Sequence, residues 1–302
     1  MALNVRRIAV LGFGEAGGIL GEELVKADCE VTMYDILLDA PDAAAAMRRR
    51  AERARVRACE STPAAVRGAD LIISAVTASS AAAAAAAASQ ALRPGQIFMD
   101  INSVSPAAKC ANAERIAASG ADYIEAAVMA PVPAQRLAVP MLLGGARANE
   151  LAVALNSLGM KITAISAQIG MASAVKMCRS IVIKGMEALT LECVMAARRL
   201  GAEKEVLASL DASFPHMGWQ QTLPSYLVGR IAEHGARRAA EMREVARTLE
   251  DAGIEPLMAS ATALRQQGLV DAMQARGIEY SSGIAASWAA LVDALGRPAK
   301  VT

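Results

Sequence analysis

The chain has few aromatic residues and no excess of charge of either sign. Aromatic residues make up 3% of its 302 residues, while 54% of the residues are hydrophobic and the net charge is +1. This much hydrophobic sequence is enough for a large core, and the length predicts two domains. Surfaces that bind nucleic acid or anionic membranes carry a clear basic excess. We therefore expect neither nucleic acid nor a membrane as a partner.

Cysteine is also scarce. The five cysteines are scattered, and none belongs to a Cys-x-x-Cys pair: Cys29, Cys59, Cys110, Cys178 and Cys193. An odd number at this spacing predicts neither a disulfide framework nor a metal site. We expect reduced cysteines that pack in the interior of a cytoplasmic protein, with no metal bound.

No stretch predicts a membrane span or a signal peptide. Residues 71–92 are uncharged and long enough to cross a membrane, yet only LIISAV at their start is strongly apolar. A buried strand followed by the alanine-rich helix 81–88 explains them better. Residues 6–20 begin with two arginines before an apolar run, as signal peptides do. Glycines and Glu15 interrupt that run, which favours strand, turn and helix.

The first half of the chain alternates between strand and helix patterns. Short apolar runs occur at 6–11, 30–35, 71–76, 97–101, 122–127, 140–145 and 161–166. Helical patterns lie between most of them, and this alternation predicts a parallel sheet covered by helices on both faces. We therefore expect a doubly wound α/β domain of Rossmann type over residues 1–166.

The second half contains helix patterns only. Residues 168–200 predict one long helix, in which Gly170 and Gly185 are the only breakers, and further helices follow. Such a helix is much longer than the average in globular proteins. We predict an all-helical domain over residues 167–302 that binds substrate and forms a dimer.

A glycine-rich stretch follows the first predicted strand and opens the first predicted helix. Its glycines, Gly12, Gly14 and Gly17, have the spacing Gly-x-Gly-x-x-Gly. In this context the first glycine permits a tight turn, the second lets a pyrophosphate approach the backbone, and the third lets helix pack on strand. We predict that a dinucleotide binds at Gly12, Phe13, Gly14, Glu15, Ala16 and Gly17.

Asp35 ends the second predicted strand, where an acid accepts hydrogen bonds from the ribose hydroxyls of an adenine dinucleotide. A carboxylate there would repel the 2′-phosphate of NADP, and residues 36–38 (ILL) offer no cation to bind it. We therefore expect NAD, with NADP the less favoured cofactor. Two interpretations of the arginines at 48–50 stay open: they fold back toward the cofactor, or they form a solvated helix face.

Polar residues follow other strands at the edge where ligands bind in such sheets. Val76 and Thr77 follow one strand, and Asn102 and Ser103 follow the next. Ser105 and Pro106 are explained as the start of a helix, but Asn102 is not. We predict that Val76, Thr77 and Asn102 contact the cofactor, and that Asn102 and Ser103 orient the reacting centre.

The long helix carries a polar stripe among apolar residues. At 100° per residue the stripe comprises Lys176, Ser180, Ile183, Lys184 and Glu187. In one interpretation this stripe lines a cleft, and in the other it is only the solvent-exposed face of the helix. A desolvated lysine beside other cations has a pKa lowered toward neutrality, which suits proton transfer.

At these residues the sequence resembles the β-hydroxyacid dehydrogenases, the relatives of 6-phosphogluconate and 3-hydroxyisobutyrate dehydrogenases. The resemblance covers the whole chain and rests on GFGEAG (12–17), DINSVSP (100–106) and GMASAVKMCRS (170–180). FPHMGW (214–219) and residues 233–256 are similar to a bacterial subgroup with its own phosphogluconate-dehydrogenase-like C-terminal domain.

The resemblance implies a mechanism and a homodimer. Lys176 would take the proton of a substrate hydroxyl while hydride passes to the nicotinamide, and some members of the family then lose CO₂. The chain departs from the family at Met129-Ala130-Pro131, where Ser-Gly-Gly usually holds the substrate carboxylate, and at Ser180, where an asparagine is usual.

Other side chains are candidates for binding the substrate. Met129 and Ser180 would contact it, and its anionic group could be bound by Arg179, Lys184, His234, Arg237 or Arg238. The last three also fit a simple helix surface, on which Arg237 pairs with Glu241 at i, i+4.

We predict an NAD-dependent oxidoreductase that acts on the hydroxyl of a small 3-hydroxy acid or sugar acid. Two alternatives stay open. Imine reductases share this two-domain plan, although they generally lack the lysine that this chain has at position 176. A non-catalytic dinucleotide sensor would keep the glycine loop without turnover.

Overall fold

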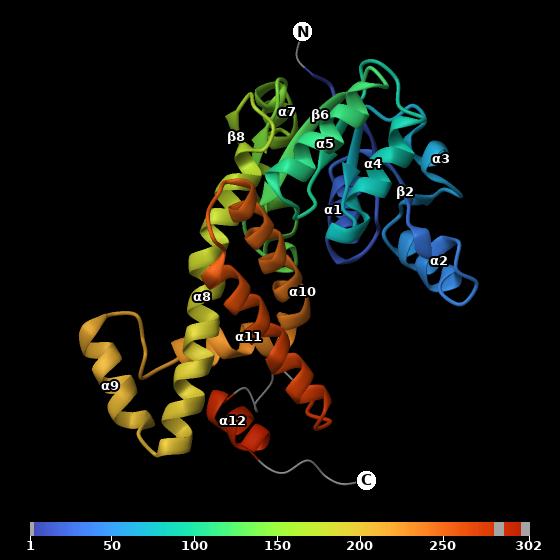
Figure 1. Cartoon of the computed structure of the whole chain (residues 1–302). Helices are drawn as coiled ribbons and strands as arrows, with labels where there is room; N and C mark the ends of the chain where they lie inside the picture. The colour runs from blue at the N-terminus through green and yellow to red at the C-terminus, as the bar shows by residue number, and fades with distance from the viewer. Residues whose placement is uncertain (1–2, 281–286, 297–302) are drawn as a thin grey trace. The chain divides into compact units, whose positions relative to one another are not determined.

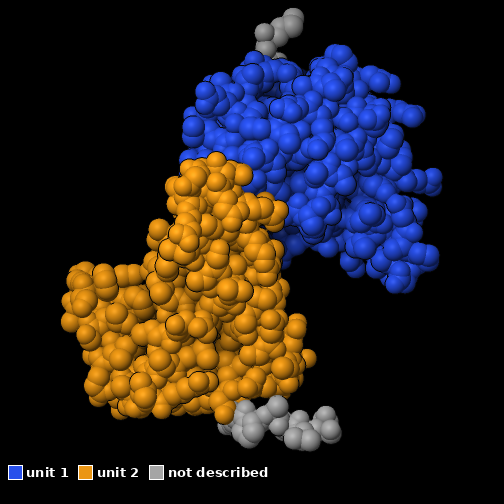
Figure 2. Space-filling view, in the orientation of Figure 1, with its two compact units in different colours: residues 1–177 blue, residues 178–302 orange. Residues whose placement is uncertain are grey.

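The chain forms two compact units. The computed structural model describes residues 3–280 and 287–296, and Figure 1 follows them in colour along the chain. Residues 1–177 make up one unit and residues 178–302 the other (Figure 2). The division falls inside a long helix, α8 (Met171–Leu200). The predicted domain boundary between residues 166 and 167 lies just before this helix and stays a prediction.

An eight-stranded sheet forms the centre of the first unit, in the order β3-β2-β1-β4-β5-β6-β7-β8. Its strands are β1 (Arg7–Leu11), β2 (Glu30–Tyr34), β3 (Arg57–Ala58), β4 (Leu71–Ser74), β5 (Ile97–Asp100), β6 (Asp122–Val128), β7 (Pro140–Gly144) and β8 (Lys161–Ser166). All seven predicted strands are present. β3 was missed because two residues are too few to show a periodic pattern.

The direction of the last two strands differs from the prediction of a wholly parallel sheet. β1 to β6 run parallel, but β7 pairs with β6 in the antiparallel sense, and β8 runs parallel to β7. A parallel crossover needs a full connecting helix. The link from β6 to β7 holds only two short helical turns, α6 (Val132–Gln135) and η3 (Arg136–Ala138), so the chain reverses there.

Helices cover both faces of the sheet, as predicted. They are α1 (Glu15–Lys26), η1 (Ile36–Leu38), α2 (Ala44–Arg53), α3 (Thr62–Val66), η2 (Ala78–Ser80), α4 (Ala81–Ser89), α5 (Pro106–Ala117) and α7 (Ala148–Asn156). Ile8 and Val10 of β1 belong to one core cluster with residues of α1 and α7. Ala9 and Leu11 belong to a second cluster with residues of α3, α4 and α5. This alternation along one strand is what a sheet buried on both faces requires.

The second unit is helical, as predicted. The remainder of α8 is followed by α9 (Glu203–Ser213), α10 (Leu223–Asp251), α11 (Leu257–Gln274) and α12 (Trp288–Gly296). One core cluster joins residues of α8, α10, α11 and α12. Gly235 does not break α10. A Cβ at Gly235 would lie 2.7 Å from Cγ2 of Val270, so the glycine lets α11 pack closely.

Within the parts of the chain that the structure describes, no helix is long and apolar enough to cross a membrane. The uncharged stretch 71–92 contains β4, η2 and α4 instead. The predicted strand and alanine-rich helix are therefore confirmed.

A buried ion pair lies between the sheet and α5. Lys109 and Asp100 are both 0% exposed, and Lys109 Nζ lies 2.9 Å from Oδ1 of Asp100. The carboxylate also accepts hydrogen bonds from the Asn112 side chain and the Tyr123 hydroxyl. Burial alone would raise the pKa of Asp100, but the Lys109 ammonium and hydrogen bonds from the Asn102 backbone N–H and the Tyr123 hydroxyl hold it below its usual value.

Lys109→Ala is expected to destabilise the first unit strongly, because it leaves the Asp100 carboxylate buried without its cation. Removing one partner of a buried pair costs about 3–5 kcal/mol. Lys161→Ala is the matched control, because Lys161 is an exposed lysine of the same sheet. Urea unfolding of both variants measures the difference. Equal midpoints for the two variants would contradict the role of Lys109.

Candidate functional site

The candidate site lies at the edge of the sheet formed by the carboxyl ends of β1 to β6. The chain leaves β1 for β2 on one side and later returns to β4 on the other, so β1 and β4 are neighbours at a switch point in the topology. Ligands of doubly wound sheets bind at such a point. The glycine loop, Asp35, Val76, Thr77 and Asn102 all follow strands that end at this edge.

The first and third glycines of the loop are required by close packing. Gly12 has φ +85°, and a Cβ there would lie 2.6 Å from the carbonyl oxygen of Ala75. A Cβ on Gly17 would lie 2.0 Å from the carbonyl oxygen of Gly12. No side chain fits at such distances. These two glycines therefore hold the turn against β4 and bring α1 down onto the sheet.

Gly14 is different, because a Cβ there would meet no atom of the described residues within 4 Å. Its φ is −68°, which any residue can adopt, and it occupies the N-cap position of α1 without any side-chain hydrogen bond to the helix. Nothing in the protein's own packing explains a glycine here. An open space over free N–H groups at the amino end of α1 fits an approaching pyrophosphate.

Asp35 joins the end of β2 to the glycine loop. Its Oδ2 accepts a hydrogen bond from the Phe13 backbone N–H at 2.6 Å, and its Oδ1 accepts one from Leu37 N–H at 3.0 Å. A carboxylate has further lone pairs, so ribose hydroxyls can still bind to it. The Phe13 side chain is fully buried in the core, so Phe13 can contribute to cofactor binding through its backbone only.

Asn102 is held rigidly beyond the end of β5. It is 4% exposed, its backbone N–H donates to Asp100 Oδ1 at 2.9 Å, and its Nδ2 donates to Ser74 Oγ at 2.9 Å. In the described structure its Oδ1 has no hydrogen-bond partner. A buried amide oxygen without a partner costs free energy, and it marks Asn102 as a residue with an acceptor to offer a ligand.

The remaining predicted cofactor residues lie beside it. Val76 is partly exposed after β4, and Thr77 is exposed with its hydroxyl bonded to those of Ser79 and Ser80. Ser103 is partly exposed after Asn102. The next helix, α5, starts as predicted, since Ser105 caps it and accepts a hydrogen bond from Ala108 N–H.

Sequence analysis missed the residue that anchors the first turn of α8. Glu125, on β6, is 0% exposed, and its carboxylate accepts hydrogen bonds from Ala172 N–H, Ser173 N–H and Ser173 Oγ. A carboxylate at a helix N-terminus satisfies the unpaired N–H groups and interacts favourably with the helix dipole. The signal that could have found it is a charge in the middle of the strand, between the hydrophobic pairs 123–124 and 126–127.

Further contacts fix the start of α8 beside the start of α5. A Cβ on Gly170 would lie 3.3 Å from Cβ of Pro106, and Cys110 Sγ lies 3.7 Å from the Ile169 carbonyl oxygen. Lys176 lies one turn beyond Ser173, is partly exposed, and belongs to the first unit. The start of α8 is therefore anchored to the unit that carries the glycine loop.

Met129 follows β6 at the same edge. Its side chain is partly exposed, and its backbone N–H donates to the carbonyl oxygen of Pro140 at 2.9 Å. A thioether is at best a weak acceptor. With its N–H already used, Met129 has no strong donor left for a substrate carboxylate.

Two of the cationic candidates on the second unit are buried with carboxylates. Lys184 Nζ lies 2.6 Å from Glu241 Oε2, and Arg238 donates hydrogen bonds to the Glu187 carboxylate from Nε and Nη2. Burial lowers the pKa of Lys184, opposed by the charge of Glu241. An anion would have to displace a carboxylate that is already paired with the buried cation at either place. The structure therefore favours a packing role for Lys184 and Arg238.

The other candidates on the second unit differ in exposure. Arg179 is exposed, whereas Ser180 is buried, at 8% exposed. Arg237 pairs with Glu241 at 3.0 Å, which confirms the predicted i, i+4 pair. His234 is partly exposed and lies 3.6 Å from Glu233, and burial lowers its pKa.

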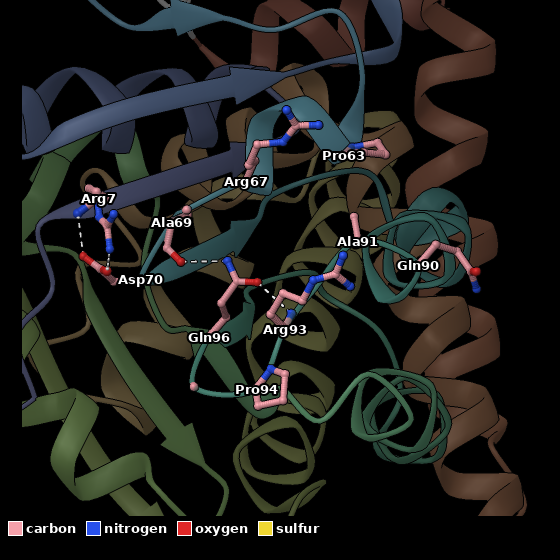
Figure 3. Close-up of a pocket in the computed structure, with 12 residues that line it drawn as sticks. Arg7, Pro63, Arg67, Ala69, Asp70, Gln90, Ala91, Arg93, Pro94 and Gln96 are labelled. Carbon is pink, nitrogen blue, oxygen red and sulfur yellow. Dashed lines mark hydrogen bonds and ion pairs between the residues drawn. The ribbon is translucent and has the colours of Figure 1, made fainter.

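A hollow in the surface lies elsewhere. It measures about 570 Å³ and is lined by residues at or before the amino ends of β1, β4 and β5, among them Arg7, Asp70 and Gln96. Figure 3 shows Asp70 paired with Arg7, and Gln96 bonded to the backbones of Ala69 and Arg93. This is the edge of the sheet opposite the glycine loop, so the hollow is separate from the candidate site. Over residues 3–280 and 287–296, no cluster of His, Cys, Asp or Glu could hold a metal ion.

Comparison with known proteins gives two family matches. Residues 7–166 match the NAD binding domain of 6-phosphogluconate dehydrogenase, and residues 197–269 match a domain of unknown function, DUF1932. The chain is 26% identical to the mitochondrial 3-hydroxyisobutyrate dehydrogenase of Drosophila melanogaster over 240 residues, which is 78% of this chain and 72% of that protein.

Comparison with solved structures gives the same relationship. A conserved hypothetical protein from Sinorhizobium meliloti is 34% identical with a TM-score of 0.77, and the match covers 96% of both chains. The 3-hydroxyisobutyrate dehydrogenase of Mycobacterium tuberculosis, solved with L-serine, has the same fold at 20% identity, with a TM-score of 0.73 over 97% of this chain and 100% of that one. With its glycine loop, its switch point and these matches, the chain belongs to the β-hydroxyacid dehydrogenase superfamily.

Proposed function

We propose that this protein is an NAD-dependent dehydrogenase that oxidises the hydroxyl of a small 3-hydroxy acid or sugar acid. The observation that carries the proposal is the open space before Gly14, at the amino end of α1, in a unit that also holds Lys176. The family membership supports the reaction class, since family members pair an NAD-binding domain with hydroxyacid oxidation. The fold alone would not identify the substrate.

The residues at this edge fit a dinucleotide. The free N–H groups of the first turn of α1 would bind its pyrophosphate, and Asp35 would accept hydrogen bonds from its ribose. Bound NAD would supply the hydride acceptor. Asn102 would offer its unpartnered Oδ1 to the reacting end of the site, with Ser103, Val76 and Thr77 beside it.

Lys176 would act as the general base. Its Nζ takes the proton from the substrate hydroxyl while the neighbouring carbon loses a hydride, so the alcohol becomes a carbonyl. General-base catalysis of this kind contributes about 10²- to 10⁴-fold to a rate. Where the product is a β-keto acid, loss of CO₂ can follow, as it does in some members of the family.

We also propose which residue binds the carboxylate of the substrate. Lys184 and Arg238 are committed to Glu241 and Glu187. Arg179 is exposed on α8, one turn beyond Lys176. We therefore favour Arg179 over the other cations, with Ser180, Met129 and His234 as further contacts of the substrate. The homodimer and the cytoplasmic location stay predictions.

The direct test measures the formation of reduced cofactor, which is monitored by its absorbance in the near ultraviolet. NAD and NADP are offered in parallel against 3-hydroxyisobutyrate, L-serine, other 3-hydroxy acids and sugar acids. We expect turnover with at least one acid and a higher kcat/KM with NAD, because the Asp35 carboxylate disfavours a 2′-phosphate. No turnover with any acid, while NADH still binds, would contradict the proposal.

One observation favours a second candidate, the reduction of C=N bonds. Met129, Ala130 and Pro131 cannot donate side-chain hydrogen bonds to a carboxylate, so a substrate without one is also compatible with the site. Oxidation of NADPH or NADH by a ketone with an amine, or by a cyclic imine, would identify this activity. Lys176 argues against it, because imine reductases generally lack that lysine. A protein that binds NADH without turnover on either panel would be the dinucleotide sensor.

A further inference from the structure

Helix α2 places three consecutive arginines next to the glycine loop. Arg48 and Arg49 are exposed, whereas Arg50 is partly buried. The buried residues of α2 are Met47 and Ala51, so the helix presents the face that carries Arg50 toward the rest of the unit. One of the two interpretations of this basic run, a uniformly solvated helix face, therefore does not describe Arg50.

Arg50 reaches the loop itself. Its Nη2 donates a hydrogen bond to the Gly14 carbonyl oxygen at 2.8 Å. The side chain crosses the first turn of α1 at Gly18, where a Cβ would lie 2.9 Å from Nη2 and 3.0 Å from Nε. Gly18 lies outside the Gly-x-Gly-x-x-Gly spacing, so the guanidinium gives a physical reason for a fourth glycine in this stretch.

The position of the guanidinium is favourable for a phosphate. Among the residues that the structure describes, no carboxylate lies within 4.0 Å of it. A guanidinium has five N–H donors, and the bond to Gly14 uses only part of them. The first turn of α1 carries Glu15, an exposed acid that would oppose an anion there. Arg50 adds a positive charge to offset it.

We propose that Arg50 binds a phosphate group of the dinucleotide at the glycine loop. This inference rests on the proposed cofactor site and adds to it a cation from another helix. Guanidinium–phosphate hydrogen bonds are strong and geometrically specific. Two phosphates are compatible with this chemistry: the pyrophosphate that NAD and NADP share, and the 2′-phosphate that only NADP carries. Comparison of NADH with NADPH distinguishes these two phosphates.

The experiment measures the Kd of NADH and of NADPH by the change in their fluorescence on binding, so it needs no substrate. Arg50→Gln removes the charge and leaves a shorter, neutral polar side chain. Arg49→Gln is the matched control, because it removes the same charge from the exposed side of the same helix. Gly18→Ala keeps the charge but puts a methyl group where the guanidinium lies. Thermal melting of each variant without cofactor confirms that it folds.

Arg50→Gln is expected to raise the Kd of NADH or NADPH at least about tenfold, the effect of losing one charge-assisted hydrogen bond. Arg49→Gln should leave both unchanged, and Gly18→Ala should follow Arg50→Gln. An equal rise for NADH and NADPH assigns Arg50 to the pyrophosphate, and a rise for NADPH alone assigns it to the 2′-phosphate.

Other results would overturn the inference. If Arg50→Gln leaves both Kd values unchanged, Arg50 has only a structural role, which is to link α2 to the start of α1 through its hydrogen bond to Gly14. Equal effects of Arg49→Gln and Arg50→Gln would reduce the contact to a general effect of charge. If the unaltered protein binds neither NADH nor NADPH, the proposed cofactor site itself fails, and this outcome is recognised before any variant is compared.

Discussion

Gly14→Ala should abolish most of the cofactor binding of this protein without affecting its folding. A methyl group on Gly14 meets no atom of the described chain within 4 Å, and the backbone there has an ordinary φ of −68°. Alanine therefore fits the protein on its own. The methyl would nevertheless project into the space that a pyrophosphate needs at the N-terminus of α1. We expect the Kd for NADH to rise at least about tenfold, since one lost or lengthened phosphate contact costs 1.4 kcal/mol or more.

Gly17→Ala is the contrasting variant. A Cβ at Gly17 would lie 2.0 Å from a backbone oxygen, so this change should destabilise the whole first unit. Chemical unfolding and NADH titration of both variants separate the two roles. If Gly14→Ala binds NADH as tightly as the unaltered protein, the space before Gly14 does not serve a dinucleotide.

Lys176→Ala is expected to reduce kcat about 10²- to 10⁴-fold, the usual range for loss of a general base. The Kd for NADH should stay the same, because the residues proposed to hold the cofactor lie on the loops after β1, β2, β4 and β5. A loss confined to kcat would mean that Lys176 acts on the reacting hydroxyl rather than on cofactor affinity. The readout is steady-state kinetics on the best acid of the panel, with NADH binding measured in parallel.

The control for this variant is Lys161→Ala, which removes an exposed lysine from β8 in the same unit. It should leave kcat and KM unchanged. Full turnover by Lys176→Ala with normal cofactor binding would remove Lys176 from the mechanism. A loss of NADH binding alongside turnover would instead indicate a disturbed fold near the start of α8.

Most of the fold could be predicted because it depends on local patterns. The strands of the sheet are short apolar runs, and the glycines of the loop have fixed spacing after the first of them. The reversal between β6 and β7 could not be predicted in the same way. It depends on the short connection between these strands, which holds only α6 and η3 and leaves no room for a full crossover helix. β3 has only two residues and leaves no periodic signal.

The same division between local and tertiary signals applies to the candidate site. Gly12, Gly14, Gly17 and Asp35 could be predicted from spacing, because the pattern of a dinucleotide-binding loop lies within one short stretch of sequence. The partners of Lys184 and Arg238 were not found, because Glu241 and Glu187 lie on different helices from the residues they bind. Glu125 was missed for the same reason, since it stabilises a helix that begins 46 residues later in the chain, at Met171 (171 − 125). Such pairings are tertiary, and periodicity carries no information on them.

The most direct test of the proposed site is a crystal structure of the protein with NADH bound. We expect the pyrophosphate at the N–H groups of Gly14, Glu15 and Ala16, the adenosine ribose on Asp35, and the nicotinamide toward Asn102, with Lys176 facing the same space. A dinucleotide bound elsewhere, such as the hollow beside Arg67 and Arg93, would contradict it. So would a nicotinamide that Lys176 cannot reach.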